Sequence, residues 1–189
     1  MDSINTLTLV HKCLRDEVKP GMFCIDATAG RGHDTALLCE LTGDAGKVIA
    51  FDVQENAVRS TRERLEARRF SSIGEVHLDS HANMENYAEA GSVDCIVFNF
   101  GFLPGGDKSI FTRADSSVAA IGAGLRLLKD GGLMCLSLYY GGPNGYEERD
   151  AILAALRQTD PRLCTVICCE FLNRKGDPPF PIFIRKGAY

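Results

Sequence analysis

Four short strand-like runs, each followed at once by Asp or Asn, constrain the fold of this chain more than any other feature. The four polar residues are Asp26, Asp52, Asp79 and Asn99. Helical patterns separate the runs, and strands that alternate with helices build a parallel sheet. Ligands of such sheets bind beyond the carboxyl ends of the strands, so we expect the four side chains to meet at one edge. Each residue taken singly is equally consistent with a helix cap or a turn former.

The hydrophobic pattern divides the chain into strands and helices. The predicted strands cover residues 22–25, 47–51, 75–78, 93–98, 133–138, 164–171 and 181–185. The predicted helices cover residues 5–18, 33–41, 55–68, 113–128 and 146–158. No helix lies between the last two strands, so they form a hairpin and one of them runs antiparallel. Seven strands that close with a hairpin resemble the Rossmann-like class I methyltransferase arrangement, which implies a mostly parallel sheet ordered 3-2-1-4-5-7-6 with helices on both faces. No linker divides the chain, so we expect one domain over residues 1–189.

Composition and charge argue against several classes of protein. No apolar run reaches the ~20 residues that a transmembrane helix needs, and the first residues lack a basic segment followed by an apolar core, so we expect a cytoplasmic protein. The formal net charge of −4 does not favour a general nucleic-acid binder. An RNA substrate would therefore require a local group of cations. Candidates are Lys108, Arg174, Lys175 and the arginines from Arg59 to Arg69, each equally consistent with scattered surface charge.

The eight cysteines do not indicate a metal centre or a disulfide framework. The chain has no Cys-x-x-Cys pair and no histidine at the spacing of a zinc ligand. Several cysteines lie in apolar runs, where a free thiol behaves as a small hydrophobic side chain. We therefore expect free cysteines, a reducing compartment and no metal site.

The loop after the first strand predicts the cofactor. Its two glycines, Gly30 and Gly32, let the backbone approach a ligand closely. A dinucleotide fingerprint shares this pair but has a third glycine, where this chain has Thr35 and Ala36. A carboxylate at the strand tip, Asp26, would repel a pyrophosphate and would attract the ammonium group of S-adenosylmethionine. The loop thus favours S-adenosylmethionine over a nicotinamide dinucleotide.

The ends of the second and third strands predict the contacts with the nucleoside part of the cofactor. Asp52 lies 22 residues after Gly30, close to the ~20 expected for an acidic residue that binds ribose hydroxyls, and Gln54 is placed to assist it. The segment Asp79-Ser80-His81 lies where an adenine edge would be read. The alternative for His81 is that it caps the following helix.

The end of the fourth strand predicts the acceptor. Asn99-Phe-Gly-Phe102 loosely resembles the Asn/Asp-Pro-Pro-Tyr/Phe motif of methyltransferases that act on amino nitrogens, although both prolines are absent. An asparagine oxygen accepts an N–H bond and aims the nitrogen lone pair at the methyl group, and the transfer then depends mainly on alignment. Phe102 would stack on a base or cover the site. Lys108 would contact a phosphate or pair with Asp107.

Longer segments carry a family resemblance. They are residues 26–35 (DATAGRGHDT), 51–54 (FDVQ), 79–81 (DSH), 99–108 (NFGFLPGGDK), 139–148 (YYGGPNGYEE) and 171–180 (FLNRKGDPPF). On these segments the chain resembles the YtqB family, described as ribosomal RNA methylases and now associated with tRNA modification as MnmM. The family commonly has Asn where this chain has Arg31, and His where it has Gly142.

The resemblance implies a specific reaction. It implies a seven-stranded fold, S-adenosylmethionine as donor, a homodimer, and methylation of the aminomethyl nitrogen of 5-aminomethyl-(2-thio)uridine at the wobble position of tRNA. The cofactor contacts would come from Asp26, Thr28, Gly30, Arg31, Gly32, Asp34, Asp52, Gln54, Asp79, Ser80 and His81. The reacting nitrogen would meet Asn99, Phe102 and Asp107, and the anticodon region would meet Lys108, Tyr140 and Arg174. Asp107 or Tyr140 would take the proton that the amine must lose.

Two alternatives stay open. A methyltransferase for ribosomal RNA or a small amine would share the cofactor site and differ in acceptor. A nucleotide-binding oxidoreductase or a binding module without catalysis belongs to another class. Asp26 and the missing third glycine argue against the oxidoreductase, and a binding module would not require Asn99 beside the cofactor.

Overall fold

The structure is a computed structural model that describes residues 4–101, 114–140 and 145–187. Its strands are β1 (Phe23–Asp26), β2 (Lys47–Asp52), β3 (Gly74–Leu78), β4 (Val93–Phe100), β5 (Leu128–Leu138), β6 (Cys164–Cys168) and β7 (Phe180–Lys186). They form one sheet in the order β3-β2-β1-β4-β5-β7-β6. β7 runs antiparallel to both of its neighbours, and the other pairings are parallel. The predicted fold class, strand order and antiparallel strand are confirmed.

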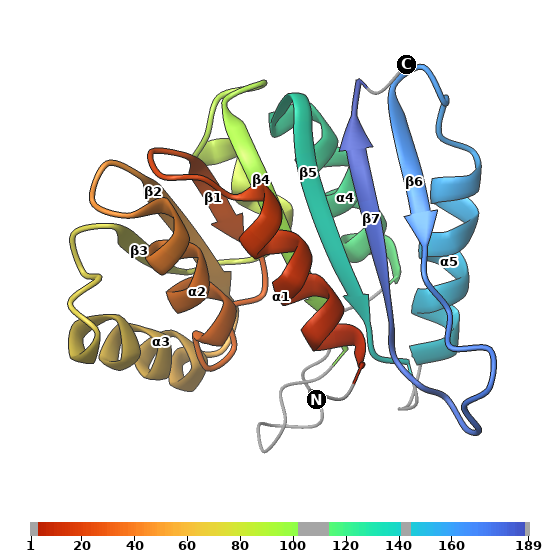
Figure 1. The fold of residues 1–189 in the computed structure, drawn as a ribbon, viewed down its shortest axis with the longest axis horizontal. Helices are drawn as coiled ribbons and strands as arrows, with labels where there is room; N and C mark the ends of the chain where they lie inside the picture. The colour runs from red at the N-terminus through yellow and green to blue at the C-terminus, as the bar shows by residue number, and fades with distance from the viewer. Residues whose placement is uncertain (1–3, 102–113, 141–144, 188–189) are drawn as a thin grey trace.

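Helices cover both faces of the sheet (Figure 1). They are α1 (Thr6–Glu17), α2 (His33–Thr42), α3 (Glu55–Ala67), α4 (Ala114–Leu127) and α5 (Gly145–Arg157), with a 3-10 helix η1 (His81–Asn86). α2 contacts α3, and α1 packs on β5 and β7, whereas α4 contacts both α5 and η1. One layer therefore consists of α1 to α3, and the opposite layer consists of η1, α4 and α5.

Several boundaries differ from the predicted ones, and one helix was not predicted. β5 begins at Leu128, five residues before the predicted start, because Leu128 pairs with Val93 ahead of a register shift in the ladder. β6 ends at Cys168 and not at residue 171. The helix η1 was not predicted, since a 3-10 helix of six residues is too short to show an apolar period.

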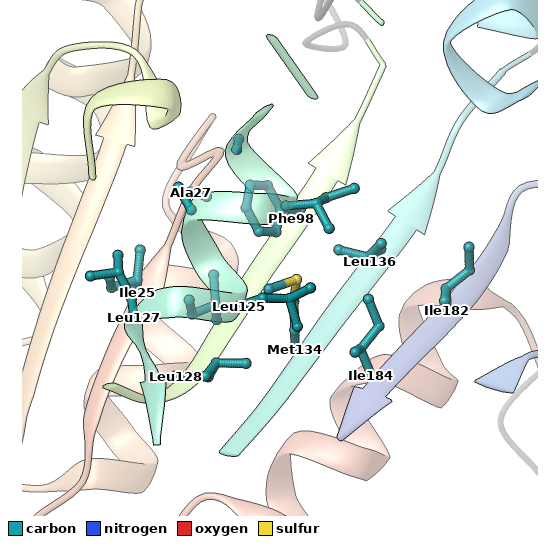
Figure 2. Close-up of a cluster of buried hydrophobic side chains, with 14 of the residues drawn as sticks. Ile25, Ala27, Phe98, Leu125, Leu127, Leu128, Met134, Leu136, Ile182 and Ile184 are labelled. Carbon is teal, nitrogen blue, oxygen red and sulfur yellow. The ribbon is translucent and has the colours of Figure 1, made fainter. Parts of the chain in front are cut away.

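Alternation along the strands sends each side chain to one of two apolar layers. Ile25 and Ala27 of the β1 region, Phe98 of β4 and Met134 of β5 pack together beside α4, as Figure 2 shows. Cys24 of β1 belongs to the other cluster, which lies beneath α1, α2 and α3. The polar residues at the strand ends continue this alternation, since Asp26 lies two positions after Cys24. Asp26 is therefore expected to point toward the layer of α1 to α3.

The start of α1 lies at the carboxyl edge of the parallel strands. Figure 1 shows the N-terminal end of α1 and the arrowhead of β5 at the same, lower edge of the sheet. A capping box closes the helix start, in which Asn5 Oδ1 accepts from the Thr8 amide at 2.9 Å and Thr8 Oγ1 bonds the Asn5 amide at 2.9 Å. The Thr6 hydroxyl donates to the carbonyl of Pro179 ahead of β7. These bonds hold the first turn of α1 over the ends of the strands.

The described part of the chain shows neither a membrane-spanning helix nor a group of metal ligands. No helix within it is long and apolar enough to cross a membrane. No group of three or more His, Cys, Asp or Glu side chains is arranged there to hold a metal ion.

Candidate functional site

A cavity of about 520 Å³ lies at the carboxyl edge, bounded by the loops after β1 to β4 and by the start of α1. Most of the residues predicted from the sequence line it. They are Thr28, Gly30, Arg31, Asp34, Asp52, Gln54, Asp79, Ser80, His81 and Asn99. The strand ends converge here because neighbouring parallel strands finish at one edge of the sheet.

Other predicted residues lie elsewhere. Asp26 and Gly32 are absent from the cavity lining, as are Tyr140 and Arg174. Tyr140 packs its ring against Arg149 and Phe180, with the Arg149 guanidinium 4.8 Å from the ring centre. The Arg174 guanidinium covers the ring of Phe171 at 3.9 Å and donates to the carbonyl of Ile4. Phe102, Asp107, Lys108 and Gly142 fall outside the described residues.

The loop after β1 that carries Gly30 and Gly32, called the glycine loop below, is closely packed against α3. Gly30 and Gly32 have φ of +54° and +73°, a region that side chains rarely adopt. A Cβ on Gly32 would lie 2.9 Å from Thr61 Cα, and the Thr61 hydroxyl donates to the Gly30 carbonyl at 3.2 Å. Any larger residue at position 32 would push the loop away from α3. Gly32 thus lets the loop lie directly against α3, and Gly30 of the same loop lines the cavity.

Asp52 ties the glycine loop to the end of β2. Its Oδ2 accepts from the Gly30 amide at 2.9 Å and its Oδ1 accepts from the Gln54 amide at 2.9 Å. A carboxylate offers about four acceptor positions, so two remain for a ligand in the cavity. Two acceptor positions are what the predicted contact with a vicinal diol such as that of ribose requires, and that contact stays a prediction.

His81 lines the same cavity and has a buried ring nitrogen without a partner. Its Nε2 is among the buried polar atoms of the described structure that lack a hydrogen bond. Burial lowers the pKa of His81, and a hydrogen bond with the Ala27 backbone opposes this. The Ala27 N–H already donates to Val97, so the carbonyl of Ala27 must be the acceptor and the other ring nitrogen its donor. Nε2 is then an acceptor, suited to the exocyclic amine of adenine.

The neighbours of His81 hold η1 in place. Asp79 accepts from the Ser80 amide and the Asn83 side chain at 2.7 Å each, and from the Tyr87 hydroxyl at 2.8 Å. Ser80 caps η1 by accepting from the Ala82 amide at 3.2 Å. The alternative that His81 caps this helix is wrong, because Ser80 occupies the cap and leaves the His81 ring to the cavity.

Asp26 lies behind the glycine loop and is fully buried. Thr35 donates its hydroxyl to Oδ2 at 2.6 Å, and the Thr28 amide donates to Oδ1 at 3.2 Å. Burial, and next the charge of Asp34, raise the pKa of Asp26 to about 7. The structure therefore does not place Asp26 where it would contact an ammonium group in the cavity. The carboxylate that lines the cavity after β1 is Asp34.

The raised pKa of Asp26 gives a first testable prediction. A folded-state pKa above the unfolded value means that the folded protein holds this proton more tightly, so stability is lost as the pH rises from about 4 through 7. We expect the unfolding free energy of the native protein to fall by about 2 kcal/mol relative to Asp26→Asn between pH 5 and pH 8. Urea unfolding at both pH values measures the difference, with the exposed Asp16→Asn as control. If the unfolding free energies of native protein and Asp26→Asn differed by the same amount at pH 5 and pH 8, the raised pKa of Asp26 would be contradicted.

Asn99 is fixed from two sides. Its backbone amide donates to Thr28 Oγ1 at 2.7 Å, and its Nδ2 donates to Asp34 Oδ2 at 2.7 Å. Because the nitrogen of the amide faces Asp34, its oxygen Oδ1 is the group left to accept from a ligand. The role predicted for Asn99 toward a substrate amine requires such an oxygen and stays a prediction.

The structure adds residues that sequence reasoning missed. Leu7, His33, Ser116 and Tyr139 also line the cavity, and His11 contacts Asp34 from outside the lining. Tyr139 follows β5, and its amide donates to the Phe100 carbonyl at 3.0 Å, which places it beside the end of β4. The sequence carried one signal for this residue, since β5 is the neighbour of β4 in the predicted order. The helix α1 carried no signal that it reaches the site.

Comparison with known families identifies the family to which the chain belongs. The model of the family described as "Putative rRNA methylase" matches residues 48–185. The chain belongs to this family. The resemblance inferred from the motifs is therefore confirmed. A relative from Arabidopsis thaliana, described as tRNA (mnm(5)s(2)U34)-methyltransferase, chloroplastic, is 36% identical over 184 residues. The alignment covers 90% of this chain and 65% of that relative, so the chain spans less than two thirds of the relative's length.

Two solved structures resemble the whole described fold. A "putative rRNA-methylase" from Clostridium thermocellum superposes with a TM-score of 0.95 at 34% identity, covering 98% of this chain and all of that one. A "putative methyltransferase" from Streptococcus mutans, solved in complex with SAH, superposes with a TM-score of 0.88 at 34% identity. The superposition covers 98% of this chain and 99% of the Streptococcus mutans chain. The family of the chain and its fold are thus established independently.

Proposed function

We propose that this chain transfers a methyl group from S-adenosylmethionine to the aminomethyl nitrogen of 5-aminomethyl-(2-thio)uridine at the wobble position of tRNA. The cofactor follows from the family, since the Streptococcus mutans relative binds SAH, the product that remains after methyl transfer. The acceptor is supported by the activity for which the Arabidopsis relative is named. We propose that residues 1–189 act as one methyltransferase domain.

The described residues fit this cofactor. We propose that Asp52 binds the ribose hydroxyls and that His81 Nε2 accepts from adenine, because both residues line one cavity and these polar groups have hydrogen-bonding capacity left. The remaining predicted cofactor contacts that line the cavity are Thr28, Gly30, Arg31, Asp34, Gln54, Asp79 and Ser80. When bound, S-adenosylmethionine supplies an electrophilic methyl group, which a nitrogen lone pair takes as the carbon–sulfur bond breaks. The protein contributes alignment, because no covalent enzyme intermediate is needed.

One observation carries the choice of an amine as acceptor. The Asn99 amide turns its nitrogen to Asp34, which leaves Oδ1 as an acceptor at the end of β4. An oxygen in this position binds an N–H group and directs the lone pair of the nitrogen away from itself. A carbon or carbonyl acceptor would gain no such bond, and Oδ1 would be desolvated without a partner, at a cost of about 1–3 kcal/mol.

The proposed reaction is tested by labelling. The protein would be incubated with S-adenosylmethionine labelled in the methyl group and with tRNA that carries 5-aminomethyl-2-thiouridine. We expect label in the wobble nucleoside after digestion, and none in tRNA already methylated there. Label in ribosomal RNA and not in tRNA would favour the ribosomal alternative, which the family description suggests. Binding of the cofactor without label in any RNA would overturn the proposed acceptor.

The proposal also includes a homodimer in the cytoplasm that contacts the anticodon region of tRNA. Arg174 lies beside the start of α1 through its bond to Ile4, at the carboxyl edge of the sheet. Light scattering on the purified protein tests the dimer, and footprinting of the bound tRNA tests the contact region.

A further inference from the structure

His11 is the polar member of an otherwise apolar stripe on α1. Leu7, His11 and Leu14 are spaced by four and then three residues, so they lie on one face of the helix. Leu7 lines the cavity and Leu14 is fully buried in the core. His11 therefore lies between the cavity and the core, with 27% of its side chain exposed. An imidazole in such a stripe loses hydration unless a polar partner meets it.

The partner of His11 is Asp34, on the first turn of α2. His11 Nε2 lies 2.6 Å from Asp34 Oδ1, and only 7% of the Asp34 side chain is exposed. The other oxygen of Asp34 accepts from Asn99 Nδ2 at 2.7 Å. One carboxylate thus connects a residue of α1 with the residue proposed to bind the acceptor amine. The three side chains come from three separate elements, α1, α2 and β4, which only the fold brings together.

The charge of Asp34 decides which way the Asn99 amide faces. Burial raises the pKa of Asp34, but the hydrogen bonds from His11 and Asn99 outweigh it, so the pKa is lowered overall. Its place in the first turn of α2 also favours the anion. An ionised carboxylate only accepts hydrogen bonds, so it requires the N–H side of both partners. A neutral carboxyl group could donate instead, and the Asn99 amide could then turn its oxygen inward.

We propose that His11 is a positioning residue that, through Asp34, holds the Asn99 amide with Oδ1 toward the acceptor. This inference rests on the proposed function, because it explains how an amine is chosen over other acceptors. His11 supplies the N–H that Asp34 Oδ1 requires. Without it, the buried carboxylate loses one of two charge-assisted bonds, and Asn99 loses the fixed partner that orients its amide.

The test compares His11→Phe with His11→Gln. Phenylalanine fills the space and lacks the N–H, whereas the terminal amide of glutamine carries an N–H at a similar reach. We expect His11→Phe to lower kcat about 10- to 30-fold, with KM for tRNA and the dissociation constant for SAH changed less than about threefold. His11→Gln should restore kcat to within about threefold of the native value. Lys12→Gln, an exposed change on the same helix, is the matched control.

A second measurement requires no turnover. The side-chain NH2 signal of Asn99 in ligand-free, ¹⁵N-labelled protein, assigned by its loss in Asn99→Ala, reports the bond to Asp34. We expect slow exchange of this NH2 in native protein and His11→Gln, and exchange at least about tenfold faster in His11→Phe.

The outcomes separate this inference from the proposed function. A kcat of His11→Phe equal to that of the native protein would overturn the inference. An exchange rate of the Asn99 side-chain NH2 that is unchanged in His11→Phe would also overturn it. Equal losses in His11→Phe and His11→Gln would also overturn it, because they would show a role in packing and not in hydrogen bonding. If native protein methylates no tRNA, the proposed function fails, whereas the Asn99 signal still decides the positioning role.

Discussion

Replacing Asn99 by alanine is expected to lower kcat for methylation of tRNA about 100- to 1000-fold. The substitution removes the oxygen proposed to bind the substrate amine, and with it the alignment of the nitrogen lone pair with the methyl group. Misplacement of a reacting group by about 1 Å can cost a factor of about 100, and lost alignment is the main term for a transfer without a covalent intermediate. Single-turnover kinetics with labelled S-adenosylmethionine measure the loss.

Binding of SAH, unlike kcat, should be nearly unchanged in Asn99→Ala. Asn99 also bonds Asp34, but Asp34 keeps its contact with His11, so the cavity should stay formed. We expect the dissociation constant for SAH to change less than about threefold in Asn99→Ala. The exposed Asn56→Ala on α3 is the matched control and should leave both kcat and binding unchanged. A rate for Asn99→Ala within threefold of the native value would remove Asn99 from the proposed site.

Replacing Asp52 by asparagine is expected to weaken binding of S-adenosylmethionine about 10- to 150-fold. Asp52 accepts from two backbone amides, those of Gly30 and Gln54, and is proposed to accept from two ribose hydroxyls as well. Asparagine has one oxygen, so its NH2 group must face either a backbone N–H or a hydroxyl. A hydrogen bond to a charged group contributes about 1.5–3 kcal/mol, and each 1.4 kcal/mol is a factor of ten in affinity.

Calorimetric titration with S-adenosylmethionine and with SAH measures this effect. Both ligands carry the same ribose, so we expect both to lose affinity by the same factor. The exposed Asp44→Asn changes the net charge equally and should bind normally. Retention of affinity within threefold in Asp52→Asn would show that the ribose is held elsewhere. Loss of affinity for only one of the two ligands would argue against a ribose contact.

Much of the site was predictable because strand ends in a parallel sheet share one edge. Asp52, Asp79 and Asn99 end three strands, and each lines the cavity as the topology requires. The spacing between Gly30 and Asp52 predicted an acidic residue at this edge, and the structure places Asp52 in the cavity lining, where it also accepts from the Gly30 amide at 2.9 Å. These features depend on local sequence and on a strand order that the right-handed crossover rule restricts.

The direction of Asp26 was not predictable in the same way. Strands in a parallel sheet are buried on both faces, so their apolar runs do not reveal which side chain points to which layer. In the structure Asp26 continues the face of Cys24 and meets Thr35 of α2, whereas Asp34 lines the cavity. Tertiary packing therefore determined that Asp34, and not Asp26, lines the cavity.

The sequence by itself determined the seven strands with their closing hairpin, the glycine loop and the polar strand ends, because each follows from short-range pattern and chain connectivity. The tertiary structure alone decided that α1 reaches the site and that His11 meets Asp34, which lies 23 positions further along the chain. It also decided which way the Asn99 amide faces, since that depends on the charge of a neighbour from another helix. Contacts between elements that are not joined by a short loop leave no period or spacing in the sequence, and they arise only when the helices dock on the sheet.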